Sequence, residues 1–351
     1  MQKKGWQSQL FVCWVAALVV PMGCDGADSG VTDTNTWTNN IPPRLQGEAN
    51  FGYCGEVSLI SAGLYYGQYL SQYDARAIAS GDKPQSHYAS QLLLGINDKY
   101  AASQMHLEAI EWSYAKENNT DSFLQWVKEN VVAGYPVAIG IYMNQYRFYH
   151  NTNPRAGSDY DHIVPVTGIG SNRPLTDPGY YPDDIITFSD NGLWHPHDPP
   201  YSFSYYFGPF QESRREANAR RGPLYSTANN GTNFGIAITG VTDPGHETLP
   251  VRVDTNVNYE RPAMKNGSNT RPDPMPLVLT VTVSNLVPGV LYKLYRYNNF
   301  GLVPDEDFNA HAAQATQSWT IQISAGNTWV MTQNILSDEI AAYRAVPVLG
   351  L

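Results

Sequence analysis

Hydrophobic residues recur with helical spacing in three parts of the first half of the chain. The first such run predicts a helix from Cys54 to about Leu70, preceded by a glycine–tyrosine turn. A second helix is predicted from about Ser103 to Lys116. A third is predicted from Asp121 to about Ala133, with apolar residues on one face and Gly134 as its C-terminal stop.

Short runs typical of β-strands follow these helices. They lie at residues 136–142, 163–169, 184–188 and 234–239. Because helices come first and strands afterwards, this part of the chain is predicted to be an α+β domain, a helix bundle plus an antiparallel sheet. Residues 194–224, rich in proline and tyrosine, are expected to run over the surface, as an excursion or a lid.

The pattern changes again after residues 241–250, which are rich in Asp, Pro, Gly, His and Glu and indicate a domain boundary. Residues 277–283 alternate apolar and polar side chains. The motif Leu-Val-Pro-Gly-Val-Leu-Tyr at 286–292 then resembles the strand corner of fibronectin type III domains, in which the tyrosine hydroxyl bonds back to the turn. With further strands at 318–323 and 329–332, an all-β sandwich domain is predicted over residues 250–348.

The N-terminus has the order of a secretory signal peptide. Two lysines precede an apolar run that ends before Gly23-Cys24, so residues 1–26 are expected to be a leader and residues 27–43 a flexible linker to a folded domain at 44–243. Gly23-Cys24 also resembles the end of a bacterial lipobox, which makes a lipid anchor at Cys24 an alternative to free secretion. The apolar run is shorter than the ~20 residues of a membrane span, so no integral span is predicted.

Composition and charge narrow the classes of partner. Apolar residues make up 42% of the 351 residues and charged residues 15%, which is ordinary for a folded protein and argues against a disordered or fibrous chain. A formal net charge of -10 argues against nucleic acid as the main partner, because nucleic-acid binding needs a lysine and arginine footprint.

The chain has three cysteines, and two of them, Cys13 and Cys24, lie in the leader or at its edge. Cys54 is therefore expected to have no intramolecular partner. An unpaired thiol is a liability in an oxidising compartment, so its presence points to a function, with a buried apolar cysteine as the alternative. At a helix N-terminus the helix dipole favours the thiolate, and the backbone N–H of Cys54 could bind an oxyanion.

Two further residues could complete a nucleophilic site. His162 introduces an apolar strand, and Asp190 ends the next one, where its carboxylate would accept a hydrogen bond from the imidazole. Asn191 is an alternative partner, and residues 189–192 also read simply as a good turn. The segment His195-Pro196-His197-Asp198 lacks a defined fourth ligand and reads as a solvated loop, so neither a metal nor a cofactor is predicted.

These motifs together resemble the papain-like cysteine peptidase superfamily, in particular the double-glycine leader peptidases of bacteriocin systems and their soluble relatives. The resemblance spans about 200 residues, from Gln46 to Gly240, and includes the Gly-Tyr-Pro-Val strand at 134–137 and the Asp-His-Ile-Val strand at 161–164. It implies that Cys54 is the nucleophile, His162 the base and Asp190 the group that orients the base.

The resemblance also implies a glutamine upstream of the cysteine that completes the oxyanion hole. Gln46 is the glutamine in that region, eight positions before Cys54 where the family usually has six, and Asn50 is the alternative. The transporter domain that accompanies the bacteriocin enzymes is absent from this sequence, so cleavage of a double-glycine leader is not implied.

The function expected from these residues is an exported cysteine hydrolase, secreted or on the cell surface, that cleaves peptide bonds of a peptide or protein substrate through a Cys54 acyl-enzyme. An amidase or acyl transferase would use the same triad with a different acceptor. The alternative from another class is a catalytically inactive papain-like binding protein whose β-sandwich provides recognition.

Overall fold

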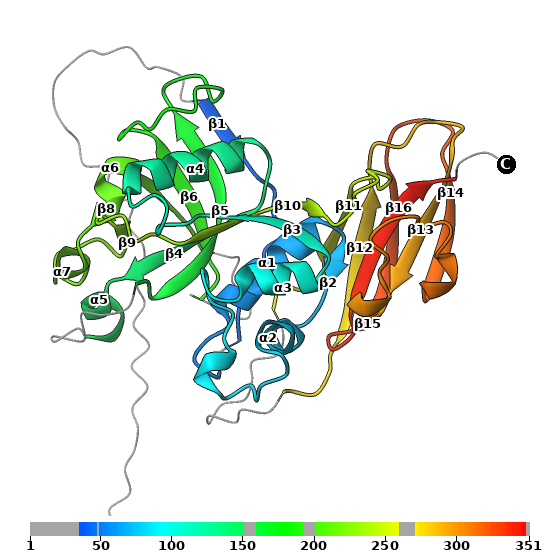
Figure 1. Ribbon diagram of the computed structural model, residues 1–351, viewed down its shortest axis with the longest axis horizontal. Helices are drawn as coiled ribbons and strands as arrows, with labels where there is room; N and C mark the ends of the chain where they lie inside the picture. The colour runs from blue at the N-terminus through cyan, green and yellow to red at the C-terminus, as the bar shows by residue number, and fades with distance from the viewer. Residues whose placement is uncertain (1–34, 48, 151–158, 193–200, 260–270, 349–351) are drawn as a thin grey trace, which may run out of the picture. The chain divides into compact units, whose positions relative to one another are not determined.

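The structure, a computed structural model, describes residues 35–47, 49–150, 159–192, 201–259 and 271–348 (Figure 1). These residues form a mixed α+β fold with mostly antiparallel sheets, which confirms the predicted α+β class. The predicted leader, with Cys24, lies outside the described residues, as does the segment 195–198.

Nine strands of the described chain form one sheet, which carries His162 and Asp190, two of the four residues predicted to be catalytic. Its central path runs β3–β10–β4–β5–β6–β7, with β1 paired to β5, and with β9 joining β4 to β8. The strands are β1 (Asn35–Thr38), β3 (Leu107–Glu111), β4 (Val137–Met143), β5 (His162–Ser171), β6 (Ile185–Asp190), β7 (Tyr201–Tyr206), β8 (Gln211–Glu212), β9 (Tyr225–Ala228) and β10 (Gly235–Val241).

Two helices cover this sheet from opposite faces. Side chains alternate along a strand, and in β5 Ile163 packs in the core cluster that contains α1 (Cys54–Tyr65), whereas Val164 packs in the cluster that contains α4 (Thr120–Val132). Both faces of β4 and β5 are therefore buried, which explains why these strands read as continuous apolar runs. The predicted helix at 121–133 is confirmed as α4.

The first helix is shorter than predicted. It ends at Tyr65, the chain turns through Gly67 with a φ of 77°, and the short strand β2 (Gln68–Tyr69) follows. Another helix, α2 (Gln72–Ser80), was not predicted. Its caps are clear in retrospect: the Ser71 side chain accepts a hydrogen bond from the Asp74 N–H at 3.0 Å, and Gly81 adopts the left-handed conformation.

The helix predicted from Ser103 to Lys116 is wrong. Helix α3 (Asp98–Gln104) ends there, His106 has a positive φ, and β3 begins at Leu107. This strand pairs antiparallel with β10, a segment more than 120 residues away in the sequence. Such a distant partner overrides the local helical preference of a short segment.

Two segments expected to be irregular contribute strands and short helices. Residues 35–38, within the stretch expected to be a linker, pair with β5 as β1. Residues 201–217, within the expected surface excursion, form β7 against β6, followed by α6 (Phe207–Phe210), β8 and α7 (Arg214–Ala217). Phe207 and Phe210 are buried, so they anchor this segment to the sheet.

The C-terminal part forms two smaller antiparallel sheets, β11–β12–β15 and β14–β13–β16–β2. The Val287 N–H donates to the Tyr292 hydroxyl at 2.9 Å, which is the bond expected from the corner motif. Strand β2 from the first half extends the second sheet by pairing with β16. Bounds are β11 (Val251–Thr255), β12 (Pro276–Val283), β13 (Leu291–Tyr297), β14 (Gln317–Gln322), β15 (Trp329–Leu336) and β16 (Ala341–Pro347).

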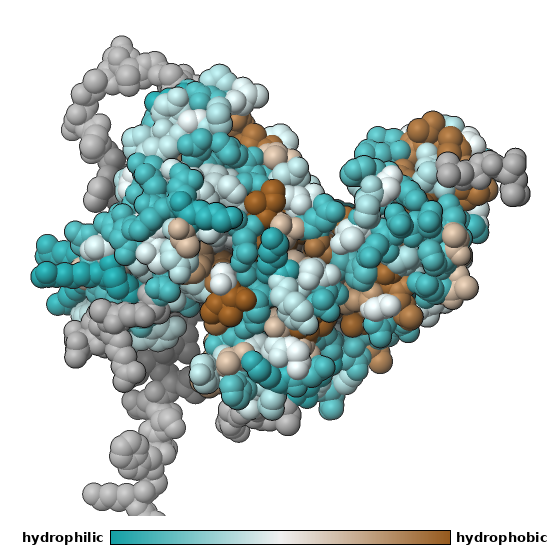
Figure 2. Space-filling model, viewed as in Figure 1, coloured by the Kyte–Doolittle hydropathy of each residue, from teal (hydrophilic) through white to brown (hydrophobic). Residues whose placement is uncertain are grey.

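One face of the molecule is mainly polar (Figure 2). On the face drawn in Figure 2, hydrophilic residues predominate and exposed apolar residues form small separate groups. One exposed aromatic side chain is Phe51, 68% accessible and three positions before Cys54. Among the described helices, none has the length and apolar character needed to cross a bilayer.

Candidate active site

Cys54 is the first residue of α1, as predicted, and its side chain is half-buried. The N–H groups in the first turn of a helix have no partner within the helix, so the Cys54 N–H is available to a ligand beside the sulfur. The other two cysteines of the chain lie outside the described residues.

The turn that leads into Cys54 has an uncommon backbone. Asn50, Phe51 and Gly52 all have positive φ, at 52°, 70° and 89°. The left-handed conformation costs roughly 1–2 kcal/mol for a residue other than glycine, so surrounding contacts must hold the turn. Gly52 adopts its positive φ without strain because glycine has no Cβ.

His162 and Asp190 meet across neighbouring strands. His162 is the first residue of β5 and Asp190 the last of β6, and Nε2 of the imidazole lies 3.0 Å from Oδ1 of the carboxylate. Both side chains are buried. With Nε2 bound to Asp190, Nδ1 is the ring nitrogen left to serve the Cys54 thiol.

The electrostatics of this pair favour the charged forms. Burial disfavours the imidazolium, but the hydrogen bond that it donates to Asp190 and the interaction with Cys54 outweigh this effect and raise the pKa of His162 to about 10. Burial also opposes ionisation of Asp190, yet its hydrogen bond to His162 lowers the pKa of the carboxyl below its ordinary value. The charged form of the imidazole is therefore favoured at neutral pH.

Asp190 is held by two more donors. The Gly192 N–H donates to Oδ1 at 2.6 Å, and the Tyr225 hydroxyl donates to Oδ2. Burial and the neighbouring carboxylate raise the pKa of Tyr225, so its hydroxyl stays protonated and remains a donor. Tyr225 was not identified in the sequence, since it lies on β9, 35 residues after Asp190, and no local motif marks it.

Gln46 lies beside the imidazole. Its Oε1 accepts the Tyr53 N–H at 2.7 Å, and its Nε2 donates to Asn191 Oδ1 at 3.4 Å. An amide nitrogen carries two N–H donors, so Nε2 can offer its second N–H to a ligand. A Cβ built on Gly192 would lie 2.8 Å from that Nε2 and 3.1 Å from Cε1 of His162, so both groups border the same small space. Glycine suits position 192 because a side chain there would crowd the Gln46 amide and the imidazole.

The two asparagines weighed as alternatives form their described hydrogen bonds with groups other than the imidazole. Asn50 donates through Nδ2 to the Tyr53 hydroxyl at 2.7 Å. Asn191 donates through Nδ2 to Ser58 Oγ at 2.9 Å and to the Ile163 carbonyl at 3.2 Å, so it ties α1 to β5. The imidazole partner given by the geometry is Asp190, and the amide beside it is Gln46.

No protein-family model matches this chain. No curated protein matches it either. What the site can do is therefore inferred from its own residues and their chemistry.

The arrangement has the parts that nucleophilic acyl transfer requires. A half-buried thiol stands at a helix N-terminus, and a buried imidazole is oriented by a carboxylate. The backbone N–H of Cys54 and the side-chain amide of Gln46 are candidate donors for an oxyanion. In the described part of the chain, no group of three or more His, Cys, Asp or Glu side chains is placed to hold a metal ion.

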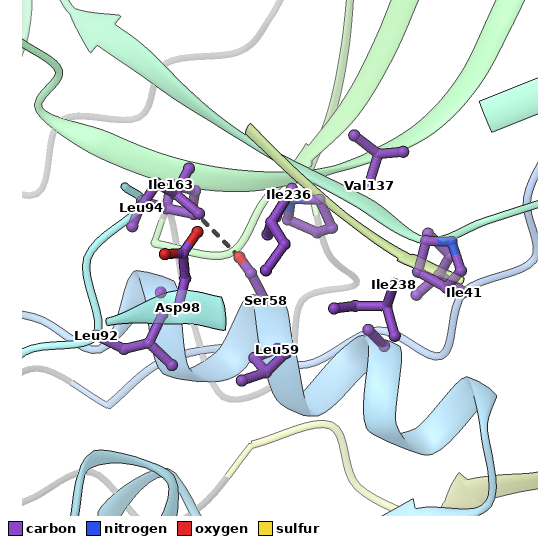
Figure 3. A pocket seen from close by; sticks show the side chains of 15 residues that line it. Ile41, Ser58, Leu59, Leu92, Leu94, Asp98, Val137, Ile163, Ile236 and Ile238 are labelled. Carbon is purple, nitrogen blue, oxygen red and sulfur yellow. Dashed lines mark hydrogen bonds between the residues drawn. The ribbon is translucent and has the colours of Figure 1, made fainter. Parts of the chain in front are cut away.

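The enclosed space beneath α1 is a separate feature. It lies between the helix and the sheet, is lined almost wholly by apolar side chains, and has a volume of only about 10 Å³ (Figure 3). This is room for about one water molecule, too little for a substrate. Asp98 is a charged residue in its lining, where Figure 3 shows it among Leu92, Leu94 and Ile163.

Asp98 should make stability depend on pH. Burial and the nearby Glu111 carboxyl raise the pKa of Asp98 to about 7 from an ordinary value of 3.8. A carboxyl that holds its proton more tightly in the folded state stabilises the fold most below pH 4. Stability is then lost as the pH rises from about 4 to about 7.

We expect Asp98→Asn to be more stable than the wild type at pH 8, by on the order of 4 kcal/mol, since the pKa of Asp98 is raised from 3.8 to about 7 and each pKa unit is worth about 1.4 kcal/mol. The asparagine can still accept the Gly95 N–H, now 3.1 Å from Oδ1. Urea unfolding at pH 4.5 and pH 8 measures the difference, with the exposed Asp82→Asn as control. Equal pH dependence of wild type and Asp98→Asn would contradict this expectation.

Proposed function

We propose that this protein is an exported cysteine hydrolase with a papain-like catalytic domain, which cleaves amide bonds of a peptide or protein substrate. The observation that supports it most strongly is the buried His162 imidazole, bound by Asp190 at Nε2 and interacting with Cys54 on its other side. The fibronectin type III-like sandwich is proposed for the two C-terminal sheets, and secretion or a lipid anchor at Cys24 for the N-terminus.

The reaction would begin with attack of the Cys54 thiolate on the substrate carbonyl carbon. The carbonyl oxygen becomes an oxyanion, which the Cys54 N–H and the Gln46 amide stabilise by hydrogen bonds. As the tetrahedral intermediate collapses, the His162 imidazolium gives its Nδ1 proton to the leaving amine. The product is a thioester on Cys54 with a neutral imidazole beside it.

Water completes the cycle. The neutral His162 takes a proton from a water molecule as its oxygen attacks the thioester carbonyl, and collapse of the second intermediate releases the acid and restores the thiolate and imidazolium. An amine acceptor in place of water would give acyl transfer by the same steps. Asp190 keeps the ring oriented and stabilises its positive charge throughout.

Alkylation of Cys54 tests the thiolate–imidazolium pair without a known substrate. We expect iodoacetamide to modify wild-type Cys54 rapidly even at pH 6, and His162→Ala to lower that rate about ten-fold or more, because the thiolate then loses its counter-ion. Mass spectrometry of the Cys54 peptide separates this reaction from that of Cys13 and Cys24. His311→Ala, an exposed histidine of the C-terminal part, is the matched control.

Equal rates and equal pH profiles in wild type and His162→Ala would rule out the pair. The inactive binding protein would then be the better interpretation.

A further inference from the structure

Arg76 of α2 lies behind the turn that leads into Cys54. Its side chain is fully buried, and its guanidinium carbon lies 3.8 Å from the centre of the Tyr53 ring. A buried guanidinium needs partners for its donors, and Arg76 finds them around a segment next to the nucleophile.

Its donors converge on backbone carbonyls of the turn. Nη1 donates to the Asn50 carbonyl at 2.7 Å and Nη2 donates to the Gly52 carbonyl. These residues flank Phe51, and all three have positive φ. Arg76 therefore binds both ends of the strained part of the turn.

Another donor of Arg76, Nε, joins the turn to the catalytic helix. Nε donates to Glu56 Oε1 at 2.6 Å, and the same oxygen accepts the Leu92 N–H at 3.0 Å. Glu56 is two residues after Cys54 and fully buried. One guanidinium thus fixes the chain on both sides of Cys54.

The turn at residues 50–52 also orients the side chain of Gln46. Tyr53 follows Gly52 directly, and its N–H orients the Gln46 amide through Oε1. A Cβ on Gly52 would lie 3.1 Å from that same Oε1, so the turn packs against the amide. A shift of this turn would move the Gln46 amide and the Cys54 N–H together, while His162 and Asp190, on separate strands, would stay in place.

We infer that Arg76 is a positioning residue for the oxyanion hole, acting through the turn at residues 50–52. This inference rests on the proposed function, because it assigns a role within the same site. Arg76 itself touches neither the thiol nor the imidazole in any described contact. Its expected effect is on stabilisation of an oxyanion, not on the reactivity of the thiol.

Two reagents separate these effects. Alkylation by iodoacetamide displaces iodide at a saturated carbon and forms no oxyanion, whereas acylation by p-nitrophenyl acetate passes through a tetrahedral oxyanion. The variant is Arg76→Met combined with Glu56→Gln, which removes the guanidinium without leaving a buried charge unpaired. Cys54→Ala supplies the background rate for acylation.

We expect the double variant to lower Cys54 acylation about ten-fold, because a small misplacement of catalytic donors has effects of this size or larger, while the alkylation rate and its pH profile stay close to wild type. The control is Lys128→Met combined with Asp184→Asn, which removes another buried ion pair, in which Nζ of Lys128 on α4 lies 2.7 Å from Oδ2 of Asp184. This control should leave both rates unchanged. A loss of stability alone would affect the two double variants alike.

Arg76→Lys provides a second variant if the first fails to fold. The lysine keeps a positive charge beside Glu56, but a single ammonium group cannot replace the two guanidinium nitrogens that bind the Asn50 and Gly52 carbonyls. The same selective loss of acylation is therefore expected. Unchanged acylation, or a parallel fall in acylation and alkylation, in a cooperatively folded variant would overturn the inference. A failure of the proposed function would give a different result. In that case the alkylation of Cys54 would not depend on His162 even in the protein with Arg76 intact.

Discussion

Replacement of Cys54 by alanine is expected to lower the proposed hydrolysis by about 10⁴-fold or more, the range seen when a covalent nucleophile is deleted. The reason is that the sulfur of Cys54 forms the acyl intermediate in the proposed reaction, and alanine has no group that can replace it. Release of new amino groups from a denatured protein substrate, followed by a fluorogenic amine reagent, measures the activity.

A matched control lies on the same helix. Ser61 is buried on α1, well past the site, and Ser61→Ala should retain activity. If Cys54→Ala were as active as the wild type, the hydrolysis would come from another group and the proposal would fail. If wild-type Cys54 forms a thioester that amines resolve faster than water, the acyl transferase becomes the better description.

Gln46→Ala should lower kcat by about 10²–10³-fold with little change in KM, the usual effect of deleting one oxyanion donor. The amide is held by the Tyr53 N–H at 2.7 Å and by Asn191 Oδ1, which lies 3.4 Å from Nε2, so the second N–H of Nε2 is an oriented donor that needs little reorganisation when charge develops on the substrate. Alkylation of Cys54 by iodoacetamide should be unaffected, because that reaction forms no oxyanion.

Asn50→Ala distinguishes the two amides considered for this role. Its Nδ2 is bound to the Tyr53 hydroxyl, so we expect a much smaller loss of kcat than for Gln46→Ala. Gln91→Ala is the matched control, since Gln91 is partly exposed and donates to the Phe51 carbonyl of the same turn at 2.9 Å. A larger effect at Asn50 than at Gln46 would reverse the assignment of the donor.

The placement of three site residues could be predicted because local signals mark them. The turn before Cys54 and the apolar spacing after it define a helix start, while His162 and Asp190 stand at the beginning and end of apolar runs. Such patterns depend only on residues near in sequence, and the structure has a helix or strand boundary at each of these positions. The predicted roles of these residues await the experiments above.

Local patterns failed where a distant partner decides the conformation. The apolar residues at 107–111 have a spacing compatible with a helix. These residues nevertheless form β3, because they pair antiparallel with β10. Residues 35–38 are polar and resemble a linker, yet β5 holds them as a strand. Neither partner can be identified from the short segment itself.

The sequence alone determined the α+β class, the helix start at Cys54 and the strand boundaries at His162 and Asp190. Only the tertiary structure decided that the Gln46 amide and the imidazole border the same space, that Tyr225 binds Asp190, and that Arg76 holds the turn before Cys54. The physical reason is that a periodic pattern is a property of one segment. Hydrogen bonds between side chains far apart in sequence depend on strand register and turn geometry, which the whole core fixes together.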